Sequence, residues 1–188
     1  KWTANSQTLS FESNGGSSVS AITQDFGTAV STPTDPTKSG YSFAGWYNEV
    51  GLTTPYTFST MGLSTTIYAK WTANSQTLSF ESNGGSSVSA ITQAFGTAVS
   101  TPTDPTKSGY TFAGWYNEVG LTTPYTFSTM SLSTTIYAKW TAANQTLTFD
   151  SNGGTAVSAI TQAFGTAVSA PTDPTKSGYS FAGWYNEV

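Results

Sequence analysis

The sequence predicts a mostly β protein, α+β at most, built from tandem copies of one small domain. The segment Lys1-Trp2-Thr3-Ala4 recurs at residues 70 and 139, a period of 69 residues. That period is long for a solenoid unit and fits a small independent domain. Apolar and polar residues alternate over several short runs, as they do in half-buried strands. Since no segment shows a sustained 3.6-residue apolar period, no long helix is expected.

The copies are nearly identical, and their spacing sets the expected domain boundaries. Residues 1–69 and 70–138 differ only at the pairs Asp25/Ala94, Ser42/Thr111 and Gly62/Ser131. We expect residues 1–4 to end a preceding repeat, 5–71 to form repeat 1, 72–140 repeat 2, and 141–188 a partial repeat 3 without its C-terminal strand. A copy without its last strand should be destabilised, or should borrow a strand and form a strand-swapped dimer.

The first half of repeat 1 reads as two strands followed by a crossover. Residues 7–12 alternate, with Leu9 and Phe11 on one face, which predicts a half-buried strand. Residues 13–16, Ser-Asn-Gly-Gly, supply a turn because Asn and Gly tolerate positive φ. Residues 19–26 form a second β-prone stretch. Two prolines in residues 32–37 exclude a helix interior or a central strand, so this part should be an ordered extended crossover.

The second half of repeat 1 adds two strands and completes a core. Residues 38–40 predict a turn, 41–47 an aromatic strand, 58–61 a single helical turn and 64–71 the last strand. Burying each large apolar side chain contributes roughly 1.5–3 kcal/mol before entropy costs, so a small core can suffice without disulfides. The predicted core comprises Leu9, Phe11, Ile22, Phe26, Val30, Phe43, Trp46, Phe58, Leu63 and Ile67.

Composition excludes several classes of function. Hydrophobic residues make up 37% and aromatic residues 14%, which argues against disorder although only 9% are charged. With a net charge of −4 and no basic patch, nucleic acid is not an expected partner. The absence of Cys and His excludes thiol chemistry and a Ser-His-Asp triad. No apolar run is long enough to predict a membrane span in this sequence.

No catalytic residue, cofactor site or metal site is predicted, and the chain is not expected to be an enzyme. The carboxylates Glu12, Asp35 and Glu49 are scattered, and Asp25 becomes Ala94 in the next copy. Residues 150–154, Asp-Ser-Asn-Gly-Gly, resemble the start of a calcium loop. The twelfth position of that loop would be Thr161, where a bidentate Glu is required, so a glycine turn is the preferred interpretation.

Two further hypotheses concern aromatic and lysine side chains. Lys38 or Lys70 could join an Asn or Asp in an internal isopeptide bond, although both lie in turn or strand-end sequence. Paired aromatic residues in each copy could stack on sugar rings, with avidity arising from repetition. The preferred alternative places each Trp in the core and leaves each Tyr partly exposed. The candidate glycan- or partner-binding residues are Trp46, Tyr47, Trp115, Tyr116, Trp184 and Tyr185.

Three segments together resemble the Listeria–Bacteroides repeat, a family that includes the B repeat of internalin-type surface proteins. They are residues 11–16 (FESNGG), 33–47 (PTDPTKSGYSFAGWY) and 67–71 (IYAKW). The resemblance spans nearly the whole of each repeat. It implies a β-grasp-like unit, similar to ubiquitin or SUMO, in bacterial cell-surface or secreted proteins. It also implies a spacer role, sometimes with weak binding, and no catalytic residues.

The predicted function is a structural stalk that projects a terminal adhesive domain from a bacterial surface. The junction between copies, at about residues 72–75, is short, which favours an extended rod of repeats that contact their neighbours. The alternative is a multivalent adhesion module whose repeats bind host glycans or a host surface protein directly. Either reading predicts an extracellular location and no cofactor.

Overall fold

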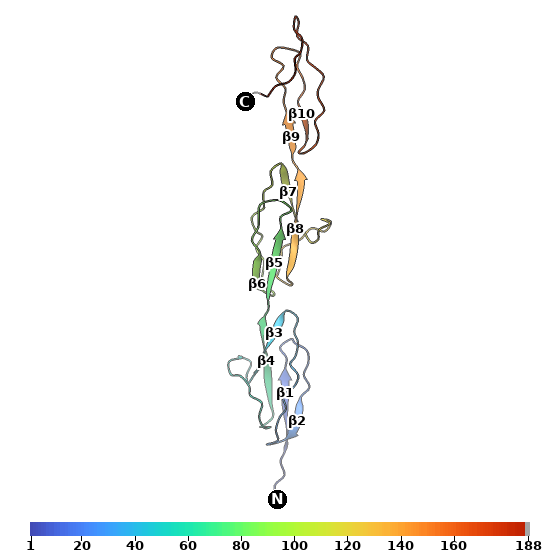
Figure 1. Ribbon diagram of the computed structural model, residues 1–188. Coiled ribbons are helices and arrows are strands. Elements are labelled where there is room, and N and C mark those ends of the chain that lie inside the picture. Colours follow the sequence, from blue (N-terminus) through green and yellow to red (C-terminus); the bar gives the residue numbers. More distant parts are fainter. Residues whose placement is uncertain (187–188) are drawn as a thin grey trace. The chain divides into compact units, whose positions relative to one another are not determined.

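Residues 1–186, described by a computed structural model, are all β and form two compact units (Figure 1). The first unit comprises Lys1–Ser79, Ala90–Thr101 and Phe127–Thr134, and the second comprises Phe80–Ser89, Pro102–Thr126 and residues 135–186. These residues contain ten strands and no helix, which confirms the mostly β, repetitive fold. The predicted helical turn at residues 58–61 is wrong, because this segment is extended and hydrogen-bonds to the segment after β2.

The first sheet is mixed, with the order β2-β1-β4-β3. The central strands β1 and β4 are parallel, with Leu9 beside Thr65 and Phe11 beside Ile67. The outer strands β2 and β3 pair antiparallel to β1 and β4, respectively. Figure 1 shows all four strands in the first unit. Their bounds are β1 (Ser6–Glu12), β2 (Ile22–Asp25), β3 (Tyr41–Tyr47) and β4 (Thr65–Ala73).

The second sheet repeats this order as β6-β5-β8-β7, and its strands have the same burial patterns as their counterparts. The third copy contributes only a two-stranded sheet of β9 and β10. Every residue of β9 is exposed, including Leu147, the counterpart of the buried Leu9 and Leu78. The remaining bounds are β5 (Ser75–Glu81), β6 (Ile91–Ala94), β7 (Tyr110–Tyr116), β8 (Thr134–Ala142), β9 (Asn144–Leu147) and β10 (Ile160–Ala163).

The turn after β1 and the proline-rich crossover both form as the sequence predicts. Asn14 and Gly15 have φ of 48° and 82°, and the Gly16 amide donates to the Ser13 carbonyl at 3.0 Å. Two positive φ angles in succession are the signature of a type I′ turn. The crossover ends where Thr37 exchanges hydrogen bonds with Ser17. The C-terminal end of the crossover is therefore tied to the residue that follows the turn.

The core of repeat 1 matches most of the predicted set. Leu9, Val30, Trp46 and Ile67 are buried, and Phe11, Ile22, Phe43 and Phe58 pack against them. Met61 and Ala69 are also buried, although the sequence pattern did not single them out for the core.

Two predicted core residues, Phe26 and Leu63, are exposed by 55% and 76% of their surface. Leu63 points outward because the residues on either side of it are held in other directions. The Met61 side chain packs in the core, and Ser64 hydrogen-bonds to the Gln7 side chain. Phe26 follows the end of β2, where its amide donates to the Asn5 carbonyl at 3.0 Å. It therefore lies at the end of the sheet and not over its face.

Candidate functional site: the junction between consecutive repeats

A single residue joins the last strand of repeat 1 to the first strand of repeat 2. Asn74 separates β4 from β5 and uses its backbone in both directions. Its amide donates to the Gly40 carbonyl at 2.9 Å, and its carbonyl accepts from the Phe95 amide at 2.8 Å. The Ser42 hydroxyl donates to Asn74 Oδ1 at 2.6 Å. We call Gly40, Tyr41, Ser42, Asn74 and Phe95 the first junction, and all five residues belong to the first compact unit.

The aromatic contact of the first junction depends on the absence of a side chain at Gly40. The Tyr41 and Phe95 rings meet edge to face, with centroids 5.4 Å apart. A Cβ added at Gly40 would lie 2.4 Å from Cγ of Phe95, and the φ of 80° at Gly40 also disfavours other residues. Phe95 is thus packed against the repeat that precedes its own, a role that its counterpart Phe26 cannot play inside repeat 1.

The second junction repeats this geometry inside the second compact unit. The Ala143 amide donates to the Gly109 carbonyl at 2.9 Å, and the Phe164 amide donates to the Ala143 carbonyl at 2.8 Å. Tyr110 and Phe164 meet edge to face at 5.6 Å. Because Ala143 replaces Asn74, this junction lacks the side-chain hydrogen bond of the first. The sequence predicted a short link, but the packing of Phe95 and Phe164 was missed.

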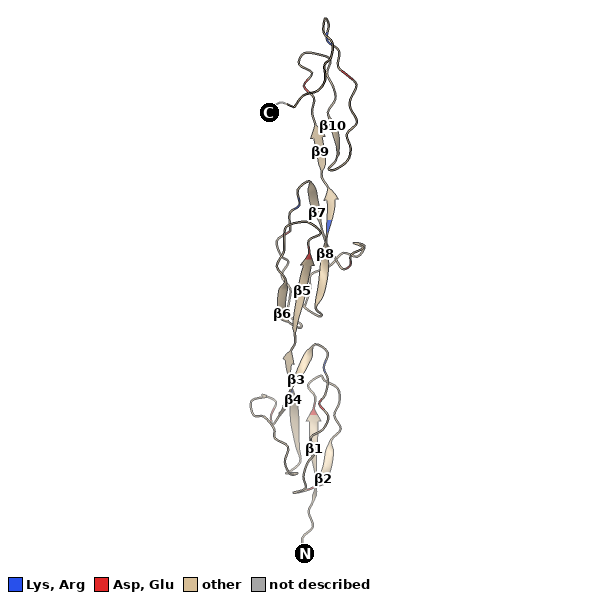
Figure 2. Ribbon diagram, in the orientation of Figure 1, with Lys and Arg blue, Asp and Glu red and all other residues tan. Residues whose placement is uncertain are grey.

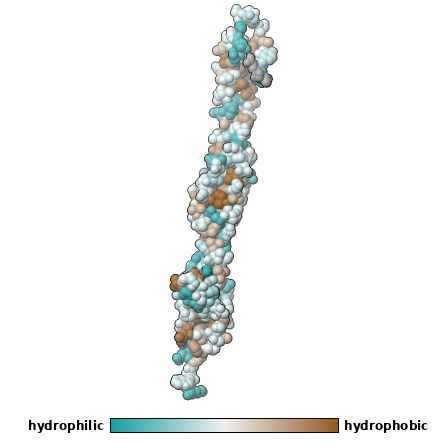
Figure 3. All heavy atoms as spheres, turned by 90° about the vertical axis from the view of Figure 1, so that its left-hand side faces the viewer, coloured by the Kyte–Doolittle hydropathy of each residue, from teal (hydrophilic) through white to brown (hydrophobic). Residues whose placement is uncertain are grey.

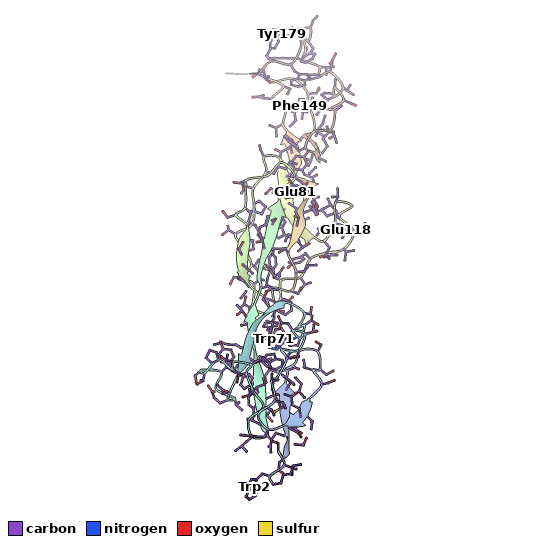
Figure 4. All side chains as sticks on the ribbon, turned by 60° about the horizontal axis from the view of Figure 1, so that its bottom comes forward. Trp2, Trp71, Glu81, Glu118, Phe149 and Tyr179 are labelled. Carbon is purple, nitrogen blue, oxygen red and sulfur yellow. The ribbon has the colours of Figure 1, made fainter. Side chains whose placement is uncertain are left out.

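Trp71 closes the end of repeat 1 next to the junction. Its Nε1 donates to the Ser13 carbonyl at 2.8 Å, and its ring meets Phe43 edge to face at 5.5 Å. A Cβ added at Gly16 would lie 2.4 Å from the Trp71 ring, so the indole covers the turn directly. In Figure 4, Trp71 lies within the folded part of its unit, whereas Trp2 lies at the free N-terminal end.

The predicted aromatic pairs occupy different environments. Trp46 and Trp115 are each only 4% exposed, and the Nε1 atoms of these two residues and of Trp184 are buried without a hydrogen-bond partner. Phe11 and Phe43 cover the Trp46 ring with centroids 4.9 and 5.4 Å away. The indoles of Trp46 and Trp115 are too deeply buried to stack on a sugar. The binding role stays a prediction, and in the described residues it would rest on the partly exposed Tyr47 and Tyr116 and the exposed Tyr185.

Lysine side chains contact backbone carbonyls and aromatic rings. Lys38 Nζ donates to the Asn14 carbonyl at 2.8 Å and lies 4.7 Å from the Tyr41 ring centroid. Lys70 Nζ donates to the Leu52 carbonyl at 3.2 Å and lies 4.6 Å from the Tyr47 ring. Both nitrogens donate to backbone carbonyls, and the isopeptide bond stays a hypothesis. Figure 2 shows how few charged residues the ribbon carries.

The loop that follows β3, residues 48–54, is held by hydrogen bonds and presents the exposed apolar residue Val50. Glu49 Oε1 accepts the amides of Thr53 and Thr54, both at 2.8 Å, and Lys70 holds the Leu52 carbonyl. Leu52 adopts a φ of 52°, which is unusual for a residue with a side chain. Val50, next to Glu49, is 74% exposed, as is Val119 in the next copy. Small brown areas interrupt a mostly pale surface in Figure 3.

Acid should loosen this loop. Hydrogen bonds from the Thr53 hydroxyl and from the Thr54 and Thr53 amides lower the pKa of Glu49. A lowered carboxyl pKa means that the folded loop favours the ionised form of Glu49. The contribution of the ionised carboxylate to the stability of the loop is therefore complete above the ordinary Glu pKa. It is lost as pH falls through the lowered value. We expect the Thr53 and Thr54 amide resonances to titrate below the midpoint of a Glu model peptide, and Glu49→Gln to abolish that titration. A midpoint at or above the peptide value would contradict this.

The described residues show no gathered set of metal-ligating side chains. Within residues 1–186, no three of His, Cys, Asp or Glu lie close enough to hold a metal ion. Within the same residues, no helix has the length and apolar composition that crossing a membrane requires. The geometry that the two units share comprises the two junctions and the aromatic contacts beside them.

Comparison with known proteins identifies one repeat family. The sequence profile of the Listeria–Bacteroides repeat domain matches residues 8–70, 77–139 and 146–188. This is a repeat family and not an enzyme family, and the names of the relatives below do not describe enzymes.

Three relatives place the repeat in larger proteins. Two proteins of Evansella cellulosilytica, provisionally named a Gly-rich membrane protein and a membrane protein, are each 42% identical over 191 residues. These matches cover 100% of this chain but 22% and 29% of the relatives. Internalin H of Listeria monocytogenes is 36% identical over 118 residues, covering 60% of this chain and 21% of its own length. The chain therefore spans less than a third of each relative.

Proposed function

The chain belongs to the Listeria–Bacteroides repeat domain family, and on that premise we propose that it is a stalk segment of a bacterial surface protein. In this role its repeats hold another part of the protein at a distance from the cell. The observation that carries the proposal is the junction: one residue links two sheets and hydrogen-bonds in both directions, while an aromatic side chain is packed across the link. Such a link restricts bending far more than a flexible linker does.

Other observations support the same proposal. The sheet order β2-β1-β4-β3, with a parallel central pair, suits a β-grasp-like unit in which an extended crossover takes the usual place of a helix. The first strand, β1, and the last strand, β4, are these central neighbours, so a pull on the two ends of repeat 1 loads the parallel pair. Two relatives are named as membrane proteins, which supports a location at the cell surface.

The stalk proposal is tested by the distance between consecutive repeats. The chain has no cysteine, so Val50→Cys and Val119→Cys provide unique sites for spin labels at two exposed and equivalent positions. Pulsed electron paramagnetic resonance should give one narrow distance distribution for this pair. A broad distribution, typical of units on a flexible linker, would overturn the stalk proposal.

Removing the aromatic contact should loosen the junction. In Phe95→Ala the ring no longer lies over Gly40 and Tyr41, so only the hydrogen bonds of Asn74 hold the junction. We expect the label distance distribution to widen at least about twofold, because edge-to-face aromatic pairs contribute roughly 0.5–1.5 kcal/mol beyond their buried area. Leu132→Ala, at an exposed residue of the same copy, is the control and should leave the distribution unchanged.

A second candidate function is multivalent adhesion. Its support is the repetition of the same exposed groups, Val50 and Val119, on loops held in place by Glu49 and Glu118. Chains of one, two and three repeats should then bind a glycan array or host cells with steeply rising avidity. No binding at any copy number would exclude this candidate and leave the stalk proposal untouched.

A further inference from the structure

The first and last strands of repeat 1 are parallel neighbours in the middle of its sheet (Figure 1). Their paired positions run from Leu9 beside Thr65 to Glu12 beside Tyr68. Since β1 and β4 point the same way, a pull on the start of β1 and the end of β4 draws the two strands past each other in opposite directions. All the hydrogen bonds between them are then loaded at once.

Side-chain hydrogen bonds continue this pair before the start of its backbone ladder. Ser64 comes directly before β4, and its amide and hydroxyl both donate to Gln7 Oε1, at 2.8 and 2.9 Å. The Thr8 amide donates in turn to the Ser64 hydroxyl at 3.0 Å. Gln7 and Thr8 belong to β1 but precede Leu9, the first residue that is paired with β4. These contacts therefore join the two chain segments where the ladder has not yet begun.

A second set of hydrogen bonds continues the pair beyond the end of the ladder. Strand β1 ends two residues before Asn14, whereas β4 runs on past Trp71. Asn14 Nδ2 donates to the Ala69 carbonyl at 2.7 Å, and Trp71 Nε1 donates to the Ser13 carbonyl at 2.8 Å. Both bonds are partly buried and cross from the turn after β1 to β4. The pair is thus held by side chains past both ends of its ladder.

Repeat 2 has the same arrangement. Its central neighbours are β5 and β8, its first and last strands, and the chain continues from them through Asn74 into β4 and through Ala143 into β9. A pull along the chain therefore enters and leaves this repeat through its central strands. The hydrogen bonds of repeat 1 recur between Ser133 and Gln76, Thr77 and Ser133, Asn83 and Ala138, and Trp140 and Ser82.

We propose that repeats 1 and 2 are load-bearing modules, in which the parallel central strands and the side-chain hydrogen bonds at both ends form a clamp against a pull along the chain. Sliding by one residue would break the ladder and both sets of side-chain bonds together. It would also displace Leu9 and Ile67, which are 1% and 0% exposed, from the core. A pull that separates the strands from one end breaks the same bonds one after another, so it needs less force.

The load-bearing role rests on the stalk proposal for the source of the pull, because a stalk transmits any force on the part that it carries. The clamp itself is a property of each repeat and does not require the repeats to be held rigidly in line. A flexible chain of clamped repeats and a rigid chain of weak repeats are both physically possible. The two proposals can therefore fail separately.

Optical tweezers acting on the full chain in two directions test the clamp. The chain has no cysteine, and Asn5, Leu63 and Thr72 are exposed, so pairs of Cys at these positions provide attachment sites for the handles. Asn5→Cys with Thr72→Cys loads the start of β1 and the end of β4, which shears the pair. Asn5→Cys with Leu63→Cys loads the two adjacent strand starts, which peels it open. We expect repeat 1 to unfold at a force at least about twofold higher in shear, where the bonds resist together.

One variant and a matched control identify the side chains of the clamp. Asn14→Gly removes the bond to Ala69, and Gly tolerates the φ of 48° at this position. At constant force it should raise the unfolding rate in shear at least about fivefold, because that bond breaks with the others. In peeling, where the Ser64 end opens first, the change should stay below about twofold. Thr23→Ala removes the 2.9 Å bond between the Thr8 and Thr23 hydroxyls, outside the loaded pair, and should alter neither rate by more than about twofold.

Three outcomes would overturn the clamp. Equal unfolding forces in the two directions would show that the parallel pair does not resist in shear. An equal rise of both unfolding rates in Asn14→Gly would make its bond a general contribution to stability. A rise in Thr23→Ala as large as that in Asn14→Gly would give the bonds across β1 and β4 no special part. The spin-label distances decide the stalk independently: a broad distribution with direction-dependent forces overturns the stalk and supports the clamp, and a narrow one with equal forces does the reverse.

Discussion

Replacing Trp71 with Ala is expected to destabilise the first unit by about 3 kcal/mol, toward the lower end of the range for aromatic-to-Ala changes because Trp71 is only partly buried. Three losses combine. The Phe43 ring loses its edge-to-face partner, the Ser13 carbonyl loses its indole donor, and a void opens over Gly16. Urea denaturation followed by circular dichroism should show part of the transition moving to a lower midpoint.

The chain supplies its own control for this change. Trp2 stands in the same Lys-Trp-Thr-Ala sequence but is exposed to solvent, so Trp2→Ala should alter stability by less than about 0.5 kcal/mol in dilute solution. Local sequence is matched in the two variants, and only the packing differs. Equal effects of the two changes would show that the indole of Trp71 is not what holds the end of repeat 1.

Much of this fold follows from short-range pattern. Alternation in residues 7–12 places Leu9 in the core, and the Asn-Gly pair at residues 14–15 dictates a turn with two positive φ angles. The prolines of the crossover exclude a helix there. Each of these rules depends on a few neighbouring residues, so a single sequence is enough to apply it.

The junction could not be predicted in the same way. Phe26 is a large apolar residue, so the sequence assigns it to the core. The role of this position appears only in the contact of its counterpart Phe95 with Tyr41 of the preceding copy, and these two residues are 54 positions apart in the sequence. Gly40 looks like an ordinary turn glycine, yet the space above it is filled by the Phe95 ring. Alternation assigns faces within a strand but is silent about residues beyond its end, which is where the repeats meet.

The same limit explains the error at Leu63. The sequence predicts a helical turn at residues 58–61 and, separately, a place for Leu63 in the core. The segment is instead extended and pairs with the residues after β2: the Met61 amide donates to the Thr28 carbonyl at 2.7 Å, and the Val30 amide donates to the Ser59 carbonyl at 2.8 Å. This pairing orients Met61 inward and leaves Leu63 in solvent.

Ile67→Ala should produce the other large loss of stability, about 3–4 kcal/mol for a fully buried aliphatic residue. Ile67 is in the central strand β4, opposite Phe11 of the parallel strand β1, and has no exposed surface. Truncation leaves a cavity in the core, over the face of the two central strands, and the closely packed surroundings cannot fill it.

Leu63→Ala distinguishes burial from hydrophobicity in this part of the chain. It removes a side chain of the same size four residues earlier, yet most of that side chain is in water, so a change below about 0.5 kcal/mol is expected. Both free energies of unfolding come from the same urea titrations. If Leu63→Ala cost as much as Ile67→Ala, the segment before β4 would have to pack inward, and the extended pairing of Met61 with Thr28 could not hold. The difference between the two variants therefore tests the register of the segment that the sequence pattern misassigned.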